Sequence, residues 1–94
     1  MEGSAKQKVP GGKLLTVKIS YSERIESVQI LGDFFLYPED SLRYIEASIT
    51  GIKTSESEAE IAKRISDAMS ANGVEIIGVT AQAIAQTIRM AVKA

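Results

Sequence analysis

The residue types that most enzymes use for catalysis are scarce in this 94-residue sequence. It contains no cysteine and no histidine, so it lacks thiolate nucleophiles, thiolate zinc sites, the commonest general base and the commonest metal ligand. Catalysis would have to rest on carboxylates, lysines, hydroxyls or backbone amides. Thr54, Ser55 and Ser57 have no candidate base beside them and are better explained as helix caps. We therefore expect no catalytic residue and no metal site in this chain.

Two short segments carry the residues best suited to binding, and the first is Lys8-Val9-Pro10-Gly11-Gly12-Lys13. Its two glycines allow backbone amides to approach an anion, with an ammonium group on either side. It is not a Walker loop, because the longer glycine spacing, the Lys-Ser/Thr pair and the following helix are missing. The segment is either a flexible lead into a strand, with solvated lysines, or a functional contact.

The second segment, Gly32-Asp33-Phe34-Phe35-Leu36-Tyr37-Pro38-Glu39-Asp40, holds three of the five aromatic residues in the chain. Phe34 and Phe35 are adjacent, and adjacent side chains of an extended strand point to opposite faces. Either one ring faces outward, or a bulge at Gly32 lets both rings enter the core. Burying an outward ring under a partner would contribute about 1.5–3 kcal/mol. Asp33 is either a turn residue or a polar contact at an interface.

Hydrophobic periodicity predicts the elements that must position these two segments. Along the chain we expect a mobile terminus over 1–7, strands over 13–21 and 24–31, a helix over 38–50, a second helix after the capping box Ser55-Glu56-Ser57-Glu58, a short strand over 74–77, and a third helix capped by Thr80. Glu39 and Asp40 would then be charges at the start of the first helix. The expected class is α+β: a small antiparallel sheet, made of a hairpin and a possible third short strand, with about three helices on one face.

Length and composition indicate a single domain over residues 8–94, with 45% apolar and 24% charged residues. A core this small leaves room for a partner to cover part of the surface. Eleven basic and twelve acidic residues give a net charge of −1, which disfavours nucleic acid as a partner. No apolar run is long enough for a membrane span, and Met1–Lys8 lacks the apolar core of a signal peptide. The sequence predicts a cytoplasmic protein.

The two segments together resemble the accessory, or C-terminal, domain of lipoate-protein ligases, in the form found as a separate small subunit of archaeal two-part ligases. The similarity runs from about Lys8 to Val92. Its specific part lies in Lys8–Leu14 and Gly32–Asp40, with weaker support from Ile77–Thr80. The chain departs from the family at Ser22-Glu23-Arg24, where we would expect an acidic–glycine pair in the turn. The fold also resembles small iron–sulfur assembly scaffolds, but the absence of cysteine argues against their chemistry.

This resemblance implies a non-catalytic subunit that forms a heterodimer with a lipoate-protein ligase catalytic subunit. Such a pair activates lipoate with ATP to lipoyl-AMP and pyrophosphate, and then passes the lipoyl group to a lysine of a lipoyl carrier domain. The accessory domain is associated with the activation step. ATP, Mg and lipoate are then expected in the partner, and no cofactor is expected on this chain alone. The indirect partners would be lipoyl domains of 2-oxoacid dehydrogenase complexes or the glycine cleavage H protein.

The same resemblance suggests which residues serve the partner. The segment expected to reach the partner's active site comprises Lys8, Pro10, Gly11, Gly12 and Lys13, with Lys13 or Lys8 offsetting phosphate charge. The segment expected to dock comprises Gly32, Asp33, Phe34 and Phe35. Two other functions fit the residues less well. One is a standalone interaction or regulatory α+β module. The other is a nucleic-acid-binding domain that uses Lys6, Lys8 and Lys13 beside the aromatic residues.

Overall fold

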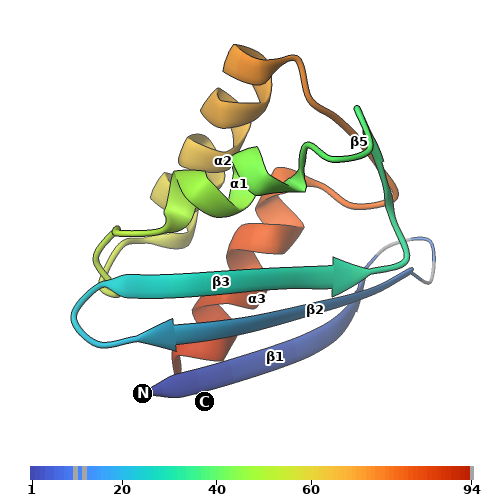
Figure 1. Cartoon of the computed structure of the whole chain (residues 1–94). Helices are drawn as coiled ribbons and strands as arrows, with labels where there is room; N and C mark the ends of the chain where they lie inside the picture. Colours follow the sequence, from blue (N-terminus) through green and yellow to red (C-terminus); the bar gives the residue numbers. More distant parts are fainter. Residues whose placement is uncertain (10, 12, 94) are drawn as a thin grey trace.

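Strands and helices make up most of residues 1–9, 11 and 13–93, which the computed structural model describes. In chain order the elements are β1 (Glu2–Val9), β2 (Lys13–Tyr21), β3 (Ile25–Gly32), β4 (Phe35–Tyr37), α1 (Leu42–Ile49), α2 (Glu58–Asn72), β5 (Glu75–Ile77) and α3 (Ala81–Lys93). The helices pack on one face of the long sheet (Figure 1). The expected α+β class, an antiparallel sheet with helices on one face, is confirmed.

The long sheet has the strand order β1-β2-β3, and both pairings are antiparallel. The expected hairpin forms two of the three strands of this sheet, β2 and β3, with Val17 opposite Ile30. A register shift between Ser20 and Tyr21 marks an irregularity just before the turn. The third strand of this sheet is β1, whereas the short strand expected over 74–77 forms as β5 and pairs elsewhere.

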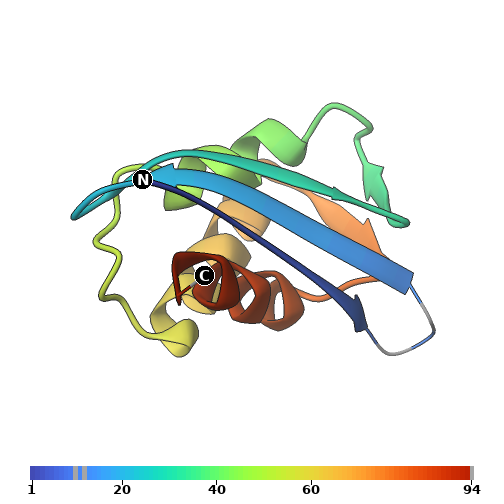
Figure 2. The same ribbon diagram turned by 90° about the horizontal axis from the view of Figure 1, so that it is seen from below.

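The N-terminal residues 1–7 were expected to be mobile, and this expectation is wrong because most of them belong to β1. Their inward positions carry small or polar side chains that fit beneath α3, so they show no apolar period. A Cβ added at Gly3 would collide with the carbonyl oxygen of Ala91. The Gln7 amide donates a hydrogen bond of 2.6 Å to the buried Thr87 hydroxyl. Figure 2 shows β1 running beside α3.

The sequence predicted that the first helix begins at Pro38, but helix α1 begins at Leu42. The residues before it form a turn in which the Ser41 N–H donates to the Pro38 carbonyl oxygen at 3.1 Å, and the Ser41 hydroxyl donates to the same oxygen. Ser41 is fully buried. Glu39 and Asp40 therefore lie in an exposed turn and not in the first turn of the helix.

The caps of the other two helices follow the sequence closely. Helix α2 is capped by Ser57, whose hydroxyl accepts a hydrogen bond from the Glu60 N–H at 3.1 Å. The capping box expected from the sequence began at Ser55, so the observed cap lies two residues later. The helix ends at Gly73, whose φ of 63° lies in the left-handed region that glycine tolerates. Thr80 caps α3 through a hydrogen bond of 3.1 Å from the N–H three residues later.

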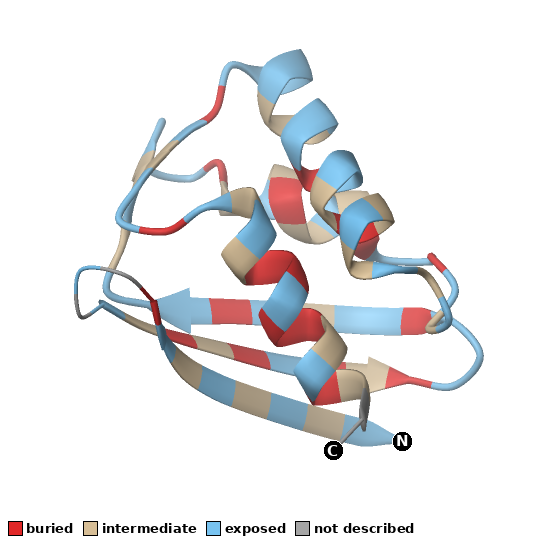
Figure 3. Ribbon diagram, turned by 180° about the vertical axis from the view of Figure 1, so that it is seen from behind, coloured by how far each residue is buried: buried red, intermediate tan, exposed pale blue. Residues whose placement is uncertain are grey.

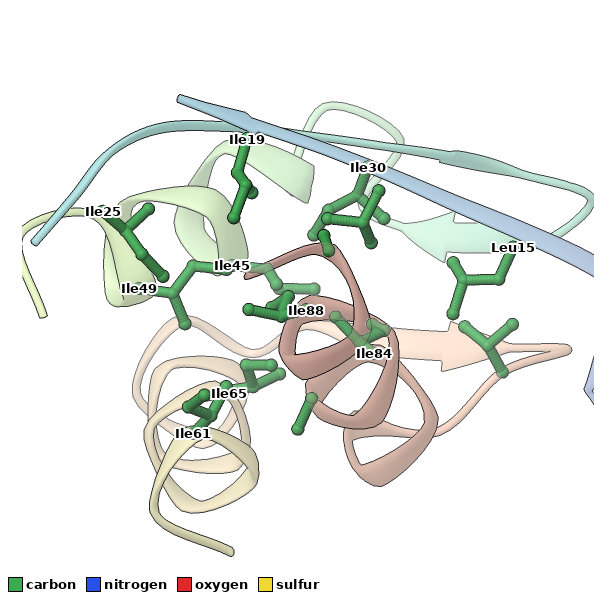
Figure 4. Close-up of a cluster of buried hydrophobic side chains, with 14 of the residues drawn as sticks. Leu15, Ile19, Ile25, Ile30, Ile45, Ile49, Ile61, Ile65, Ile84 and Ile88 are labelled. Atoms are coloured by element: carbon green, nitrogen blue, oxygen red, sulfur yellow. The ribbon is translucent and has the colours of Figure 1, made fainter. Parts of the chain in front are cut away.

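The core lies between the long sheet and the helices and is rich in isoleucine. Figure 4 shows side chains from all three helices pointing toward those of β2 and β3, and the labelled residues are Leu15, Ile19, Ile25, Ile30, Ile45, Ile49, Ile61, Ile65, Ile84 and Ile88. The buried positions on the helices face the sheet, and the exposed positions face solvent (Figure 3). In the part of the chain that the structure describes, no helix has the length and apolarity needed to cross a membrane.

Candidate functional site

The two segments singled out by sequence meet at one end of the long sheet. Gly32 lies opposite Leu15 in the register, and the Asp33 N–H donates to the Leu14 carbonyl oxygen at 3.1 Å. A Cβ added at Gly32 would collide with that same oxygen. Gly32 is therefore required because the backbones approach closely there. The structure thus brings together segments 8–14 and 32–37, at the right-hand end of Figure 1.

A third segment, residues 75–80, joins them at this end. Gly78 has a φ of 109°, and a Cβ added there would lie 3.4 Å from the carbonyl oxygen of Asp33 and from the Cα of Phe34. Just before it, β5 pairs with β4 in a separate antiparallel ribbon, with Phe35 opposite Ile77 and Tyr37 opposite Glu75. All three segments on which the family resemblance depends are therefore neighbours in space.

The two adjacent phenylalanines have opposite environments. Phe34 is half-buried and packs against the core, whereas Phe35 is 69% exposed. One ring therefore faces outward, and the alternative in which both rings enter the core is wrong. Leu36 and Ile76, opposite each other in the register, also pack against the core and form the inner face of the ribbon.

The outer face of the ribbon carries three large apolar side chains: Phe35, which the sequence singled out, and Tyr37 and Ile77, which sequence reasoning missed. Phe35, Tyr37 and Ile77 are 69%, 72% and 60% exposed. They share one face because strand side chains alternate and because Phe35 lies opposite Ile77. We call these three residues the ribbon patch. The period-two pattern over 35–37 and 75–77 was the available signal, but three-residue strands are too short for periodicity to identify them.

Carboxylates flank β4 in the sequence, and one lies opposite it in the register. Asp33 and Glu39 are exposed on either side of β4, and Glu75 is exposed opposite Tyr37. Asp40 is also exposed and lies 3.8 Å from the Arg43 guanidinium. A hydrogen bond of 3.1 Å to the neighbouring tyrosine hydroxyl and, to a smaller extent, the Asp40 charge raise the pKa of Arg43, so it stays protonated. Across residues 1–9, 11 and 13–93, no three acidic side chains are grouped so that they could hold a metal ion.

The two lysines of the first segment lie on opposite faces of the sheet. Lys8 is opposite Leu14 and Lys13 is opposite Val9, and both lysines are exposed. Because neighbouring register positions alternate between faces, a ligand held against one face would meet only one of them. Gly11 has a φ of 95°, whereas the expected contacts at Pro10 and Gly12 lie outside the described residues.

Lys13 is on the face that also carries an apolar hollow. The hollow has a volume of about 200 Å³ and is lined by Val9, Gly78, Val79, Thr80 and Ala83. It lies where the start of α3 approaches the end of β1. The lining of the hollow is apolar apart from backbone groups and the Thr80 hydroxyl. The hollow itself therefore supplies no charged group, and the charge at this end of the sheet comes from Lys13 and the residues beside it.

One of three comparisons with known proteins found a similar chain. A comparison with protein-family models gives no match, and a comparison with curated proteins gives none either. Among solved structures, the chain is similar to one from the structural analysis of an archaeal lipoylation system, a bipartite lipoate protein ligase and its E2 lipoyl domain from Thermoplasma acidophilum. The sequence identity is 30%, the TM-score is 0.76, and the match covers 95% of this chain and 96% of the other. The chain therefore belongs to the same family as that component of the Thermoplasma lipoylation system.

Proposed function

We propose that this chain is the accessory subunit of a bipartite lipoate protein ligase. It associates with the catalytic subunit and supports the ATP-dependent activation of lipoate to lipoyl-AMP, from which the lipoyl group passes to carrier domains. The observation that carries this proposal is the 30% identity with a component of a bipartite ligase system along both chains. The three segments behind the family resemblance also converge at one end of the fold, which supports a shared role in contacting a partner.

The chemistry of the chain supports an assisting role. Without histidine or cysteine, the chain has no strong candidate for general acid–base or nucleophilic work. ATP, Mg²⁺ and lipoate would then bind the catalytic subunit. Lys13 is the residue of this chain best suited to act on the reaction, because it is exposed at the end where the segments meet. A lysine placed near phosphates there would stabilise the charge that develops when pyrophosphate leaves.

The structural analysis of the Thermoplasma lipoylation system covers an E2 lipoyl domain as well as the ligase, so a carrier role must be distinguished from an accessory role. A carrier has to present a lysine amine on a protruding turn that enters the ligase active site. Here the turn between β2 and β3, residues 22–24, contains no lysine, whereas exposed Lys8 and Lys13 flank the segment between β1 and β2.

One reconstitution separates these roles. The chain is mixed with the catalytic ligase subunit encoded by the same organism, lipoate, ATP-Mg²⁺ and a lipoyl domain, and the intact masses of all proteins are measured. We expect the lipoyl domain to gain a lipoyl group only when this chain is present, while the mass of this chain stays unchanged. A lipoyl group found on this chain itself would make it a carrier and would overturn the accessory role.

A further inference from the structure

The ribbon patch is a concentration of exposed apolar surface. Six large apolar side chains are exposed among the described residues, and three of them belong to a ribbon of six residues. Three side chains of this size, each about two-thirds exposed, present roughly 300–400 Å² of apolar area. One side of a standard interface covers about 800 Å². The patch is therefore large enough to be the apolar centre of such an interface, with surrounding polar residues supplying the rest.

The chain itself does not need this surface for folding. The inner face of the ribbon, Leu36 and Ile76, already packs against the core. Phe35 and Ile77 are direct cross-strand neighbours, so their side chains lie within contact distance and form one continuous surface. Exposing a contiguous apolar patch to water is energetically unfavourable, and patches of this kind mark interaction sites in soluble proteins.

The charges around the patch determine which partner fits it. Asp33, Glu39, Asp40 and Glu75 contribute four exposed carboxylates, whereas the basic groups identified at this end of the fold are the Arg43 guanidinium beside Asp40 and the Lys13 ammonium. In a symmetric dimer formed through this patch, the same surface would face itself and carboxylates would meet carboxylates. A second copy of this chain is therefore disfavoured. An apolar site rimmed by lysine and arginine complements the patch in both its centre and its rim.

We propose that the ribbon patch docks this chain onto an apolar site, rimmed by lysine and arginine, on the catalytic subunit. The inference rests on the proposed function and specifies its interface. It changes the docking residues expected from sequence, because Phe34 packs inward and Tyr37 and Ile77 take part instead. Phe35 is the centre of the contact, since it lies opposite Ile77 across the ribbon and shares its face with Tyr37.

The test measures binding of the full chain to the catalytic subunit by calorimetry. The double variant Phe35→Ala/Ile77→Ala should weaken the dissociation constant at least about tenfold, because truncated anchors in the centre of an interface cause losses of this size. Met90→Ala is the matched control, since Met90 is 41% exposed on α3 and lies outside the ribbon. It should change the constant less than about twofold. Circular dichroism confirms that each variant is folded.

A second variant tests the charge rim without removing apolar area. Glu75→Lys should slow association several-fold at low salt, and the difference from the parent should shrink as salt increases. If the parent binds and the double variant binds equally well, the docking surface lies elsewhere while the accessory role stands. If the parent fails to bind the catalytic subunit, both proposals are wrong. Self-association that Phe35→Ala abolishes would assign the patch to a second copy and overturn the inference.

Discussion

Two uncovered sheet faces in this molecule differ in composition. The outer face of the long sheet carries Ser4, Lys6, Thr16, Lys18 and Gln29 at neighbouring register positions. It also carries one exposed apolar side chain, Leu31, opposite Thr16. The outer face of the ribbon carries only large apolar side chains and one carboxylate. Neither face is covered by a helix. A sheet face that water covers is normally polar, so the mostly polar face of the long sheet suits solvent, whereas the apolar face of the ribbon suits a partner.

The comparison shows that exposure alone does not identify a binding surface. The long sheet also has a hollow of about 410 Å³ on its outer face, lined by residues such as Ser4, Lys18, Ser20 and Gln29. It is larger than the hollow beside Val9, and its lining mixes these polar side chains with apolar atoms, including those of Ile19 and Val28. The ribbon patch lines neither of these two hollows. It is nevertheless the better candidate, because contiguous apolar area and not concavity makes association with another protein favourable.

The largest effect is expected when the same substitution is made in the core and in the ribbon patch. Ile84→Ala removes a side chain that is 0% exposed and should lower the free energy of unfolding by about 2–5 kcal/mol. Ile77→Ala should change it by less than about 0.5 kcal/mol, because that side chain is 60% exposed. Urea denaturation measures both. Equal losses would mean that the ribbon patch stabilises the isolated chain, and the contrast between the two faces would disappear.

The next effect concerns activation chemistry. Lys13→Ala in the reconstituted pair should slow lipoyl-AMP formation by roughly tenfold or more, since contacts to charged groups contribute about 1.5–3 kcal/mol. Transfer from preformed lipoyl-AMP should change much less. Lys18→Ala is the control, because Lys18 lies in the same strand on the water-covered face. If both variants match the parent in both half-reactions, Lys13 has no role near the phosphates.

A smaller loss of stability is expected where β1 meets α3. Gly3→Ala places a methyl group against the Ala91 carbonyl oxygen, and relieving that overlap should cost about 1–3 kcal/mol in the free energy of unfolding. Ser4→Ala, at the next position on the water-covered face, is the control and should stay within about 0.5 kcal/mol of the parent. An unchanged stability for Gly3→Ala would mean that β1 is not held against α3.

The smallest effect is expected on the polar face itself. Lys6→Ala and Lys18→Ala should leave the unfolding free energy within about 0.5 kcal/mol of the parent. The affinity for the catalytic subunit should also stay within about twofold, because this face is assigned to solvent. A tenfold loss of affinity from either substitution would show that the partner contacts the long sheet, and would remove the contrast with the ribbon.

Sequence reasoning succeeded where signals were local and strong. The alternation over 13–21 and the caps at Ser57 and Thr80 correspond to β2, α2 and α3. It failed at β1, because Gly3 and the other inward residues of that strand are too small or polar to produce an apolar period. It also failed at the start of α1, because Pro38 suits a helical first turn but here accepts two hydrogen bonds from Ser41 in a separate turn.

The candidate site was predicted only in part. The sequence drew attention to Phe35 and to Lys13, but nothing local indicated that residues 35–37 pair with residues 75–77. Such long-range pairing depends on where α1 and α2 return the chain, which no short window of sequence contains. The ribbon patch therefore became visible only when the register placed Ile77 opposite Phe35.

The most direct measurement is the rate of pyrophosphate release from ATP and lipoate by the catalytic subunit as this chain is added. The accessory role predicts little release from either protein alone, and a rate that rises with added chain and saturates near equal amounts of the two. Full activity of the catalytic subunit without this chain, or release by this chain alone, would contradict the central claim.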